Sequence, residues 1–159
     1  MKKIFKPLCT FICLFTLLCS STSVQAEDSV ISTHVECLEN GGKLEVTIIE
    51  HNANPTTKST SKTKSASKVV KYRDSKSTVC WSVTVTGTFT YNGSTSKCTA
   101  SKVSASSNNS NWRIASKSSS RSGNTASATA TAKRYNGSSV VQTVTRTVKL
   151  SCSKTGVLS

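Results

Sequence analysis

Acidic and histidine side chains are missing from the second half of this 159-residue chain, where no Asp, Glu or His occurs from Val79 onward. General acid–base catalysis usually needs one of these three residue types. Their absence excludes a two-carboxylate glycosidase and a Ser-His-Asp triad from residues 79–159. Composition leaves a Ser–Lys pair open, but Ser and Lys are so abundant that such pairs arise by chance. We therefore expect a protein that is not an enzyme and holds no cofactor.

Long apolar runs are also missing, apart from Leu8–Leu18, which is too short to span a bilayer. Three lysines precede this run, and Val24-Gln25-Ala26 follows it. This order is typical of a secretory signal peptide, and we place its cleavage after Ala26. Cys19 follows Leu18, where lipoprotein processing needs a small residue, so we favour export over lipid attachment. The chain is expected to be secreted, either extracellular or associated with the cell wall, with no membrane span.

Positive charge is unevenly distributed over the expected mature chain. After residue 26 it holds 18 Lys and Arg (21 minus Lys2, Lys3 and Lys6) and 7 acids, a net charge of +11. Residues 27–50 have a net charge of −5, whereas residues 51–159 have a net charge of +16. The acidic segment is therefore a candidate to fold back and mask the basic domain. The alternative is an extra hairpin attached through Cys37.

The domain organisation follows from composition. Residues 27–50 read as two short strands around the turn Asn40-Gly41-Gly42. Residues 51–66 are rich in Lys, Ser and Thr and have no large apolar side chain, so we expect an exposed, extended linker. The packed domain is expected over residues 67–159.

Strict alternation of apolar and hydroxyl side chains marks the stretch from Cys80 to Tyr91 as a strand. Gly87 interrupts its apolar face, which indicates a bulge or a close approach by a neighbouring strand. Asn92-Gly93 predicts a hairpin turn. A second copy of Tyr-Asn-Gly-Ser at residues 135–138 predicts another hairpin. There a three-residue loop would set the alanines of residues 126–132 opposite Val144 and Val148, while a two-residue loop would set them opposite threonines.

About six short strands and no helical period predict an all-β fold: a small antiparallel β-sandwich, immunoglobulin-like or similar. Removal of the signal peptide leaves four cysteines, an even number that predicts two stabilising disulfides. They are Cys37, Cys80, Cys98 and Cys152. The first hairpin would hold Cys80 and Cys98 over ~20 Å apart, far beyond the ~7 Å limit between bridged Cα atoms. Two pairings stay open: 37–80 with 98–152, or 37–98 with 80–152. Ligand spacing for a metal is lacking.

Five stretches of the sequence carry a family resemblance. They are the run from Trp81 to Ser94, Cys98-Thr99, Trp112, Lys133-Arg134-Tyr135 and the C-terminal stretch Val148–Ser159. Together they resemble an uncharacterised family of small secreted proteins from Gram-positive bacteria. The resemblance covers roughly residues 68–159. It implies a β-rich fold and a Cys98–Cys152 pair, and it implies no activity and no site residues. Cys80 departs from the family pattern, which has an apolar residue there, and this weakens a Cys37–Cys80 bridge.

Charge is the remaining indicator of function. The bases have two interpretations. In the first, they only keep a Ser/Thr-rich sheet in solution and block edge-to-edge pairing. In the second, they attract an anionic polymer, either teichoic acid or an acidic glycan, whereas sequence-specific nucleic acid binding is not expected. The candidate anion-binding residues are Lys97, Lys102, Arg113, Lys117, Arg121, Lys133, Arg134, Arg146 and Lys149. We therefore expect a non-catalytic, basic, envelope-associated domain. The alternative is a cationic effector, antimicrobial or bacteriocin-like, acting on membranes. The oligomeric state is not indicated.

Overall fold

The computed structural model describes residues 27–39, 41–51 and 60–159. Three expectations therefore fall partly or wholly outside the described residues. These are the signal peptide (1–26), Asn40 of the first turn, and residues 52–59 of the linker.

The described residues form eight strands and no helix, which confirms the all-β prediction. The strands are β1 (Ser29–Cys37), β2 (Lys43–His51), β3 (Lys62–Arg73), β4 (Val79–Tyr91), β5 (Ser96–Ser107), β6 (Trp112–Ser122), β7 (Thr125–Asn136) and β8 (Ser139–Ser151). They build two antiparallel sheets, ordered β1-β2-β3-β4-β5 and β6-β7-β8. Within this part of the chain there is no helix long and apolar enough to cross a membrane.

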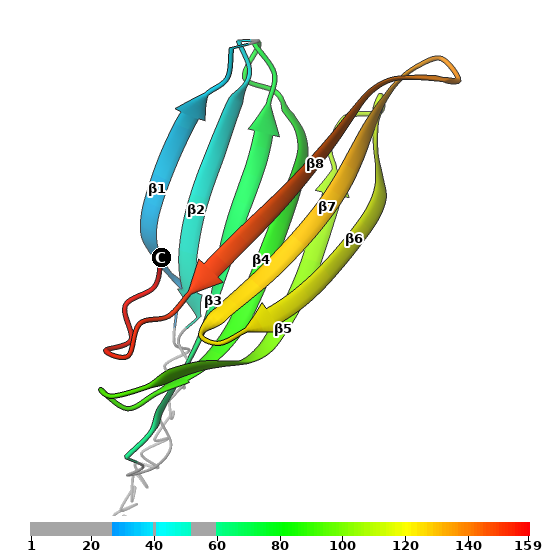
Figure 1. The fold of residues 1–159 in the computed structure, drawn as a ribbon. Coiled ribbons are helices and arrows are strands. Elements are labelled where there is room, and N and C mark those ends of the chain that lie inside the picture. The colour runs from blue at the N-terminus through cyan, green and yellow to red at the C-terminus, as the bar shows by residue number, and fades with distance from the viewer. Residues whose placement is uncertain (1–26, 40, 52–59) are drawn as a thin grey trace, which may run out of the picture.

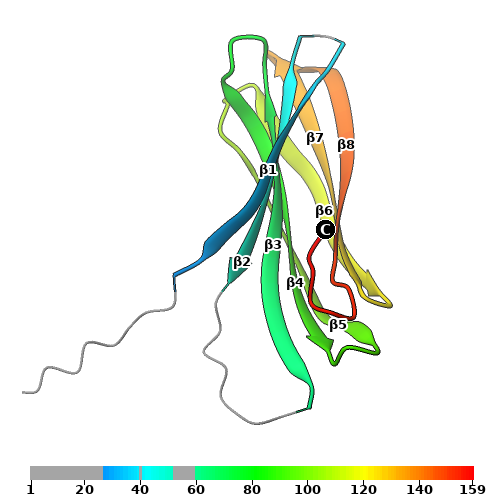
Figure 2. The same ribbon diagram turned by 90° about the vertical axis from the view of Figure 1, so that its left-hand side faces the viewer.

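The two sheets face one another, and the apolar core lies between them (Figures 1 and 2). The three-stranded sheet covers β3, β4 and β5, whereas β1 and β2 extend beyond its edge strand β8 (Figure 1). One side of the molecule is therefore closed by β5 and β6. The opposite side, between β8 and strands β1–β3, is only partly covered.

The alternation in β4 determines which of its side chains enter the core, as predicted. Trp81, Val83, Val85 and Phe89 are at most 1% exposed. Between the buried residues, the hydroxyl side chains of β4 are half-exposed on the outer face. Opposite this row lie four fully buried alanines of β7, at positions 126, 128, 130 and 132. The small alanines allow the second sheet to approach the aromatic residues of β4 closely.

At Gly87 the opposite sheet approaches β4 closely. A Cβ atom at this position would lie 2.5 Å from the ring of Phe89 and 2.9 Å from the Cβ of Ala126. Contacts this short require neighbouring atoms to move. The predicted close approach by a neighbouring strand is confirmed, and the strand is β7 of the opposite sheet.

The β7–β8 hairpin has the predicted face but not the predicted loop. Ala132 lies opposite Val144 and Ala128 opposite Val148, so the alanines do face valines. The turn, however, contains only two residues, Gly137 and Ser138, because Asn136 pairs with Ser139. A register shift between Arg134 and Tyr135 places one extra residue within the paired strands, and this has the same effect on the register as the predicted third loop residue.

The acidic segment and part of the predicted linker belong to the first sheet. β1 and β2 pair as the expected hairpin, and β2 then pairs along its whole length with β3. Residues 62–66, assigned to the linker from their composition, are the first half of β3, and Ala66 is fully buried. The linker prediction was wrong there because β4 supplies backbone partners along the whole segment and β2 pairs with Ser65 and Ala66, so this segment needs few large apolar side chains. The boundary at residue 67 accordingly does not separate two units.

Candidate functional site

The nine candidate anion-binding residues all lie on β5–β8, and the structure distributes them over three places. Among the described residues none of the nine forms an ion pair with a carboxylate. The bases that do form ion pairs with Glu45 and Glu50 are Lys64, Lys71 and Arg73, all on β3. The unpaired bases are therefore available to an external anion.

The first place is the closed side, where β5 and β6 meet. Lys97 and Lys102 project from β5, while Lys117 and Arg121 lie on β6 with their side chains on one face of that strand. We call these four residues the basic seam. Arg121 borders two shallow hollows of about 510 and 340 Å³, the first shared with Lys97 and the second with Lys102. The two hollows are thus bordered by three bases, Lys97, Lys102 and Arg121, and by no carboxylate, whereas Lys117 lines neither hollow.

Serine hydroxyls hold the seam closed. The Oγ of Ser119 on β6 donates to the carbonyl of Ser101 on β5 at 3.3 Å. The Oγ of Ser101 in turn donates to the carbonyl of Ser127 on β7, also at 3.3 Å. Short side chains at these positions let the two sheets come together with no apolar filling between them.

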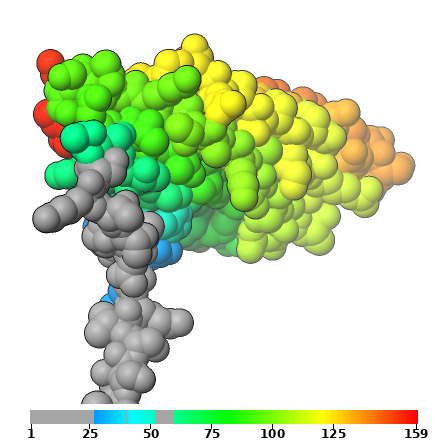
Figure 3. All heavy atoms as spheres, turned by 90° about the horizontal axis from the view of Figure 1, so that it is seen from below, coloured from blue at the N-terminus to red at the C-terminus, as the bar shows by residue number. Residues whose placement is uncertain are grey.

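The second place is the β7–β8 turn, which projects at one end of the molecule (Figures 1 and 3). Arg113 lies opposite Lys133 in the sheet, and its guanidinium stacks 4.7 Å from the ring centre of Tyr135. Arg134 is exposed beside them. Val140 and Val141 at the same turn are 47% and 48% exposed. The turn therefore combines apolar side chains with a cluster of bases.

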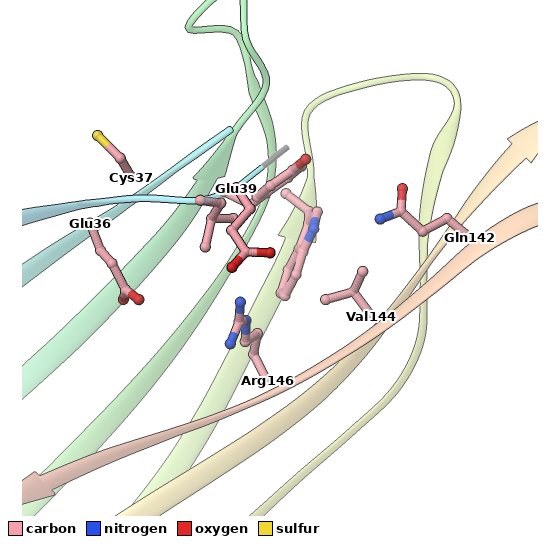
Figure 4. Close-up of a pocket in the computed structure, with 9 residues that line it drawn as sticks. Glu36, Cys37, Glu39, Gln142, Val144 and Arg146 are labelled. Carbon is pink, nitrogen blue, oxygen red and sulfur yellow. The ribbon is translucent and has the colours of Figure 1, made fainter. Parts of the chain in front are cut away.

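The third place is the open side, where Arg146 of β8 enters a cavity of about 570 Å³. We call this space the Arg146 cavity. It is lined by Glu36, Cys37, Leu38, Glu39, Tyr72, Trp81, Gln142, Val144 and Arg146. The guanidinium of Arg146 and the carboxylate of Glu39 point toward one another across the cavity, and Gln142 and Val144 project into it from β8 (Figure 4).

Arg146 is incompletely satisfied in this cavity. Its Nε is buried and has no hydrogen-bond acceptor, and the described carboxylates form no ion pair with its guanidinium. The indole N–H of Trp81 is likewise buried without a partner. Buried donors without acceptors are uncommon, because each loses its hydrogen bonds to water. Lys149, three residues along β8, is exposed and lines a neighbouring cavity of about 490 Å³ that also contains His34.

His34 and Glu36, which the sequence places on one face of a strand, both lie exposed on β1 but border different cavities. They do not form one cluster with a third titratable group. Across the part of the chain that the structure describes, no three His, Cys, Asp or Glu side chains are grouped as metal ligands would be.

One Asp-His-Ser arrangement does exist, among residues before the acid-free region. Asp28 Oδ2 lies 2.8 Å from His51 Nδ1, and His51 Nε2 lies 2.7 Å from Ser67 Oγ. Ser67 Oγ also shares a hydrogen bond with Thr86 at 2.7 Å, and Ser67 is only 6% exposed. His51 and Ser67 lie on the paired strands β2 and β3. The sequence did not reveal this contact because its residues come from three separate segments.

The four cysteines that follow residue 26 are free thiols in the structure. Cys37, Cys80 and Cys98 lie on β1, β4 and β5 of the first sheet, whereas Cys152 directly follows β8 of the second sheet. Cys37 and Cys80 are separated by β2 and β3, since Cys37 aligns with Lys43, Lys43 with Arg73 and Arg73 with Val79. Three strand spacings amount to about 14 Å, twice the reach of a disulfide. The Cys37–Cys80 pairing was therefore wrong for this fold.

Cys98 lies opposite Phe89 rather than near Gly87, and so is about 30 Å along β4 from Cys80. Cys98 and Cys152 share one end of the molecule, where their amides donate to the carbonyls of the consecutive residues Gly123 and Asn124. This location also excludes the alternative pairing of Cys80 with Cys152. Burial raises the pKa of the thiols of Cys80, Cys98 and Cys152.

The acidic hairpin is held to β3 by ion pairs. Glu45 accepts from Arg73 Nε at 2.8 Å and from Lys71 Nζ at 3.1 Å, and these hydrogen bonds lower the pKa of its carboxyl group. Glu50 pairs with Lys64 at 2.8 Å. A masking role would require the acidic segment to form ion pairs with the nine candidate residues. Its ion pairs in the structure are instead with bases of its own sheet.

Comparisons with protein-family models, with curated proteins and with solved structures found no match to this chain.

Proposed function

We propose that this chain is a secreted, non-catalytic, basic β-domain that associates with anionic polymers of the cell envelope, either teichoic acid or an acidic glycan. The observation that carries the proposal is that nine bases on β5–β8 lack carboxylate partners among the described residues, while three bases of β3 are paired. An extended polyanion binds such a surface by releasing counterions, so affinity falls steeply with salt. Its place of action is extracellular or at the wall of a Gram-positive cell.

The basic seam is the proposed contact surface. Three of its four bases border two hollows that share Arg121, and this row suits a linear chain of phosphates or uronates better than the scattered bases elsewhere. Sequence-specific binding of nucleic acid is not part of the proposal, because the proposed location is outside the cell and the sequence has no base-reading motif.

For the scaffold we propose a β-sandwich stabilised by a Cys98–Cys152 disulfide in the oxidising space outside the cell. The facing sheets and the shared location of these two residues support it. Each sheet is a simple meander, so we place the fold beside immunoglobulin domains, which have Greek-key connections, and not among them.

The test of function is cosedimentation of the protein, without its predicted signal peptide, with purified Gram-positive cell walls. Walls with and without teichoic acid are compared over a salt series. We expect retention that needs teichoic acid and is lost at high salt. The variant K97Q/K102Q/K117Q/R121Q should lose most of this retention.

A matched variant separates the seam from net charge alone. The variant K43Q/K62Q/K76Q/K154Q removes an equal number of positive charges, four, from exposed positions outside the seam. It should retain most wall binding. Equal loss in both variants would refute the seam as the contact, and no retention by the wild type at low salt would refute the polymer as the partner.

Absence of catalysis has its own test. The poor access to Ser67 and its second hydrogen bond to Thr86 support a structural role for the Asp28–His51–Ser67 contact. A fluorophosphonate probe should therefore not label Ser67 in the folded protein. Labelling that disappears in S67A would contradict the proposal and indicate a hydrolase.

The exposed valines of the β7–β8 turn favour a second candidate, a cationic effector acting on membranes. Aliphatic side chains flanked by Arg113, Lys133 and Arg134 are the elements of interfacial binding to anionic lipid. Dye release from anionic vesicles that is abolished in V140S/V141S would favour this candidate. Intact vesicles would leave the wall polymer as the partner.

A further inference from the structure

The Arg146 cavity carries opposite charges on its two walls. Glu36 at the end of β1 and Glu39 in the following turn provide carboxylates on one wall. Arg146 on β8 provides a guanidinium on the other wall, and it faces Glu39 across the space (Figure 4). The walls belong to different sheets, so the separation of their charges is set by the packing of the sheets.

The charges on the two walls do not neutralise one another directly. Arg146 forms no ion pair with the described carboxylates, and its Nε has no acceptor. A guanidinium usually recruits a carboxylate or phosphate by a forked pair of hydrogen bonds. The cavity thus keeps an arginine in a half-buried position with its usual partner missing.

The remaining lining gives the cavity a shape suited to a small molecule. Tyr72 and Trp81 form an aromatic part of its lining, their ring centres 6.3 Å apart, and Trp81 is almost completely buried. Leu38 and Val144 add aliphatic surface, and Gln142 offers an amide beside Arg146. A volume of about 570 Å³ is in the range of small-molecule sites.

We propose that the Arg146 cavity binds a compact zwitterion, a group with a primary ammonium and an acidic oxygen group a few atoms apart. The anionic group would accept hydrogen bonds from Arg146 and Gln142, and the ammonium would be held by Glu36 and Glu39. Short aliphatic parts of the ligand would contact Leu38 and Val144.

Charge complementarity decides for a zwitterion against simpler ligands. A purely anionic ligand would be drawn to Arg146 but would face two carboxylates. A purely cationic ligand would be drawn to the carboxylates but would face the guanidinium. Only a ligand with both charges meets an opposite charge on each wall.

Two sources supply this chemistry outside a cell: a free amino acid, or an aminoacyl ester carried on a polyol phosphate chain. The second source rests on the proposed function, because it would make the cavity a reader of substituents on the polymer that the basic seam retains. The experiment therefore keeps the two surfaces separate.

The probes are D-alanine, glycerol phosphate, D-alanine methyl ester and the D-alanyl ester of glycerol phosphate. Binding is followed by intrinsic tryptophan fluorescence, to which Trp81 of the cavity lining and Trp112 both contribute, and by amide NMR shifts at slightly acid pH, where the esters persist. We expect either or both zwitterions to bind at least about tenfold more tightly than the anion or the cation. Preference for the glycerol phosphate ester indicates the polymer source, and preference for D-alanine indicates a free amino acid.

Variants assign the binding to the two walls. R146Q and E36Q/E39Q should each weaken zwitterion binding by roughly tenfold or more, because each removes the charge from one wall of the cavity. K154Q, an exposed lysine that lines no part of this cavity, is the matched control and should bind as the wild type does. Near-ultraviolet circular dichroism of each variant checks that the aromatic packing is preserved.

Equal binding of all four probes, or binding unaffected by both wall variants, would overturn the proposal. So would the absence of binding at millimolar concentration. Wall retention is measured in parallel. If the wild type binds no probe but R146Q is still retained by walls, only the zwitterion proposal is refuted. If the seam variant loses wall retention but still binds the probes, the seam is a contact separate from the cavity.

Discussion

The closed and the open side of the molecule use the same two sheets but differ in how their edges meet. On the closed side, β5 and β6 lie close enough for the Ser119 hydroxyl to donate to the Ser101 carbonyl, and the charged side chains that border the hollows there are all bases. On the open side, β8 stays apart from β1 and β2, and cavities lined by acids, bases and aromatic rings remain. The same two sheets therefore present shallow hollows bordered by bases on one side and, on the other, a cavity that carries both signs of charge.

The largest expected effect concerns the core between the sheets. Phe89→Ala should lower the free energy of unfolding by about 3–5 kcal/mol, because it empties a fully buried site beside Gly87 and Ala126. Val144→Ala, on the half-buried open side, should cost only about 1 kcal/mol. Urea unfolding of both variants checks the contrast, and equal losses would mean that the open side is as tightly packed as the core.

The next effect concerns the cysteines at one end of the molecule. Under oxidising conditions C98A/C152A should lose about 2–4 kcal/mol of stability, since a bridge between these residues restricts the unfolded chain. C37A, at an exposed position on the open side, should change stability little. Non-reducing peptide mapping identifies the bridge, and a map with any other intramolecular pair would contradict the register of β1–β4.

A smaller effect concerns the acidic hairpin that forms the outer part of the open side. The hydrogen bonds from Arg73 and Lys71 lower the pKa of Glu45 in the folded state. Their stabilisation is therefore present above the ordinary carboxyl pKa and is lost as the pH falls through the lowered one. Glu45→Gln should cost about 1 kcal/mol or less at pH 7, and its difference from the wild type should vanish at low pH. Urea titrations over this range measure the difference, and a gap that does not depend on pH would exclude charge as its cause.

The smallest effect concerns the closed side. Ser119→Ala removes one hydrogen bond of 3.3 Å at an exposed strand and should change stability by no more than about 0.5 kcal/mol. Ser119→Lys serves as the sharper variant, because a long side chain there would separate β6 from β5. Hydrogen exchange at the amides of β5 and β6 should rise in the lysine variant and stay unchanged in the alanine variant.

Periodicity was a reliable guide where one strand face is buried. The alternation from Trp81 to Phe89 predicted the core face of β4, and the alanines of β7 were correctly set against valines. The loop before β8 was predicted one residue too long because a register shift inside the hairpin has the same effect on the face as a longer loop. Sequence alone does not distinguish the two.

Composition was a poor guide where backbone pairing dominates. Residues 62–66 resemble a linker, yet all five pair with β4, two of them also pair with β2, and Ala66 is buried. The Arg146 cavity could not be predicted either, since its lining comes from residues 36–39, 72, 81 and 142–146. Only the packing of one sheet on the other brings these segments together. The bases of the basic seam were predicted from the sequence, but the two hollows in which Arg121 meets Lys97 and Lys102 required the structure.

The strand order has a consequence for how the chain assembles. Every strand pairs with its neighbour in the chain, and the one step between sheets is the short connection at residues 108–111. Pairing between neighbours in the chain favours rapid folding. A chain that emerges N-terminus first during synthesis or export would therefore complete the first sheet before the second sheet exists. That first sheet would meanwhile expose the uncovered face of Trp81, Val83, Val85 and Phe89. Emergence halted after Ser107 would therefore yield an ordered but adhesive intermediate, and the last 50 or so residues act as its cover.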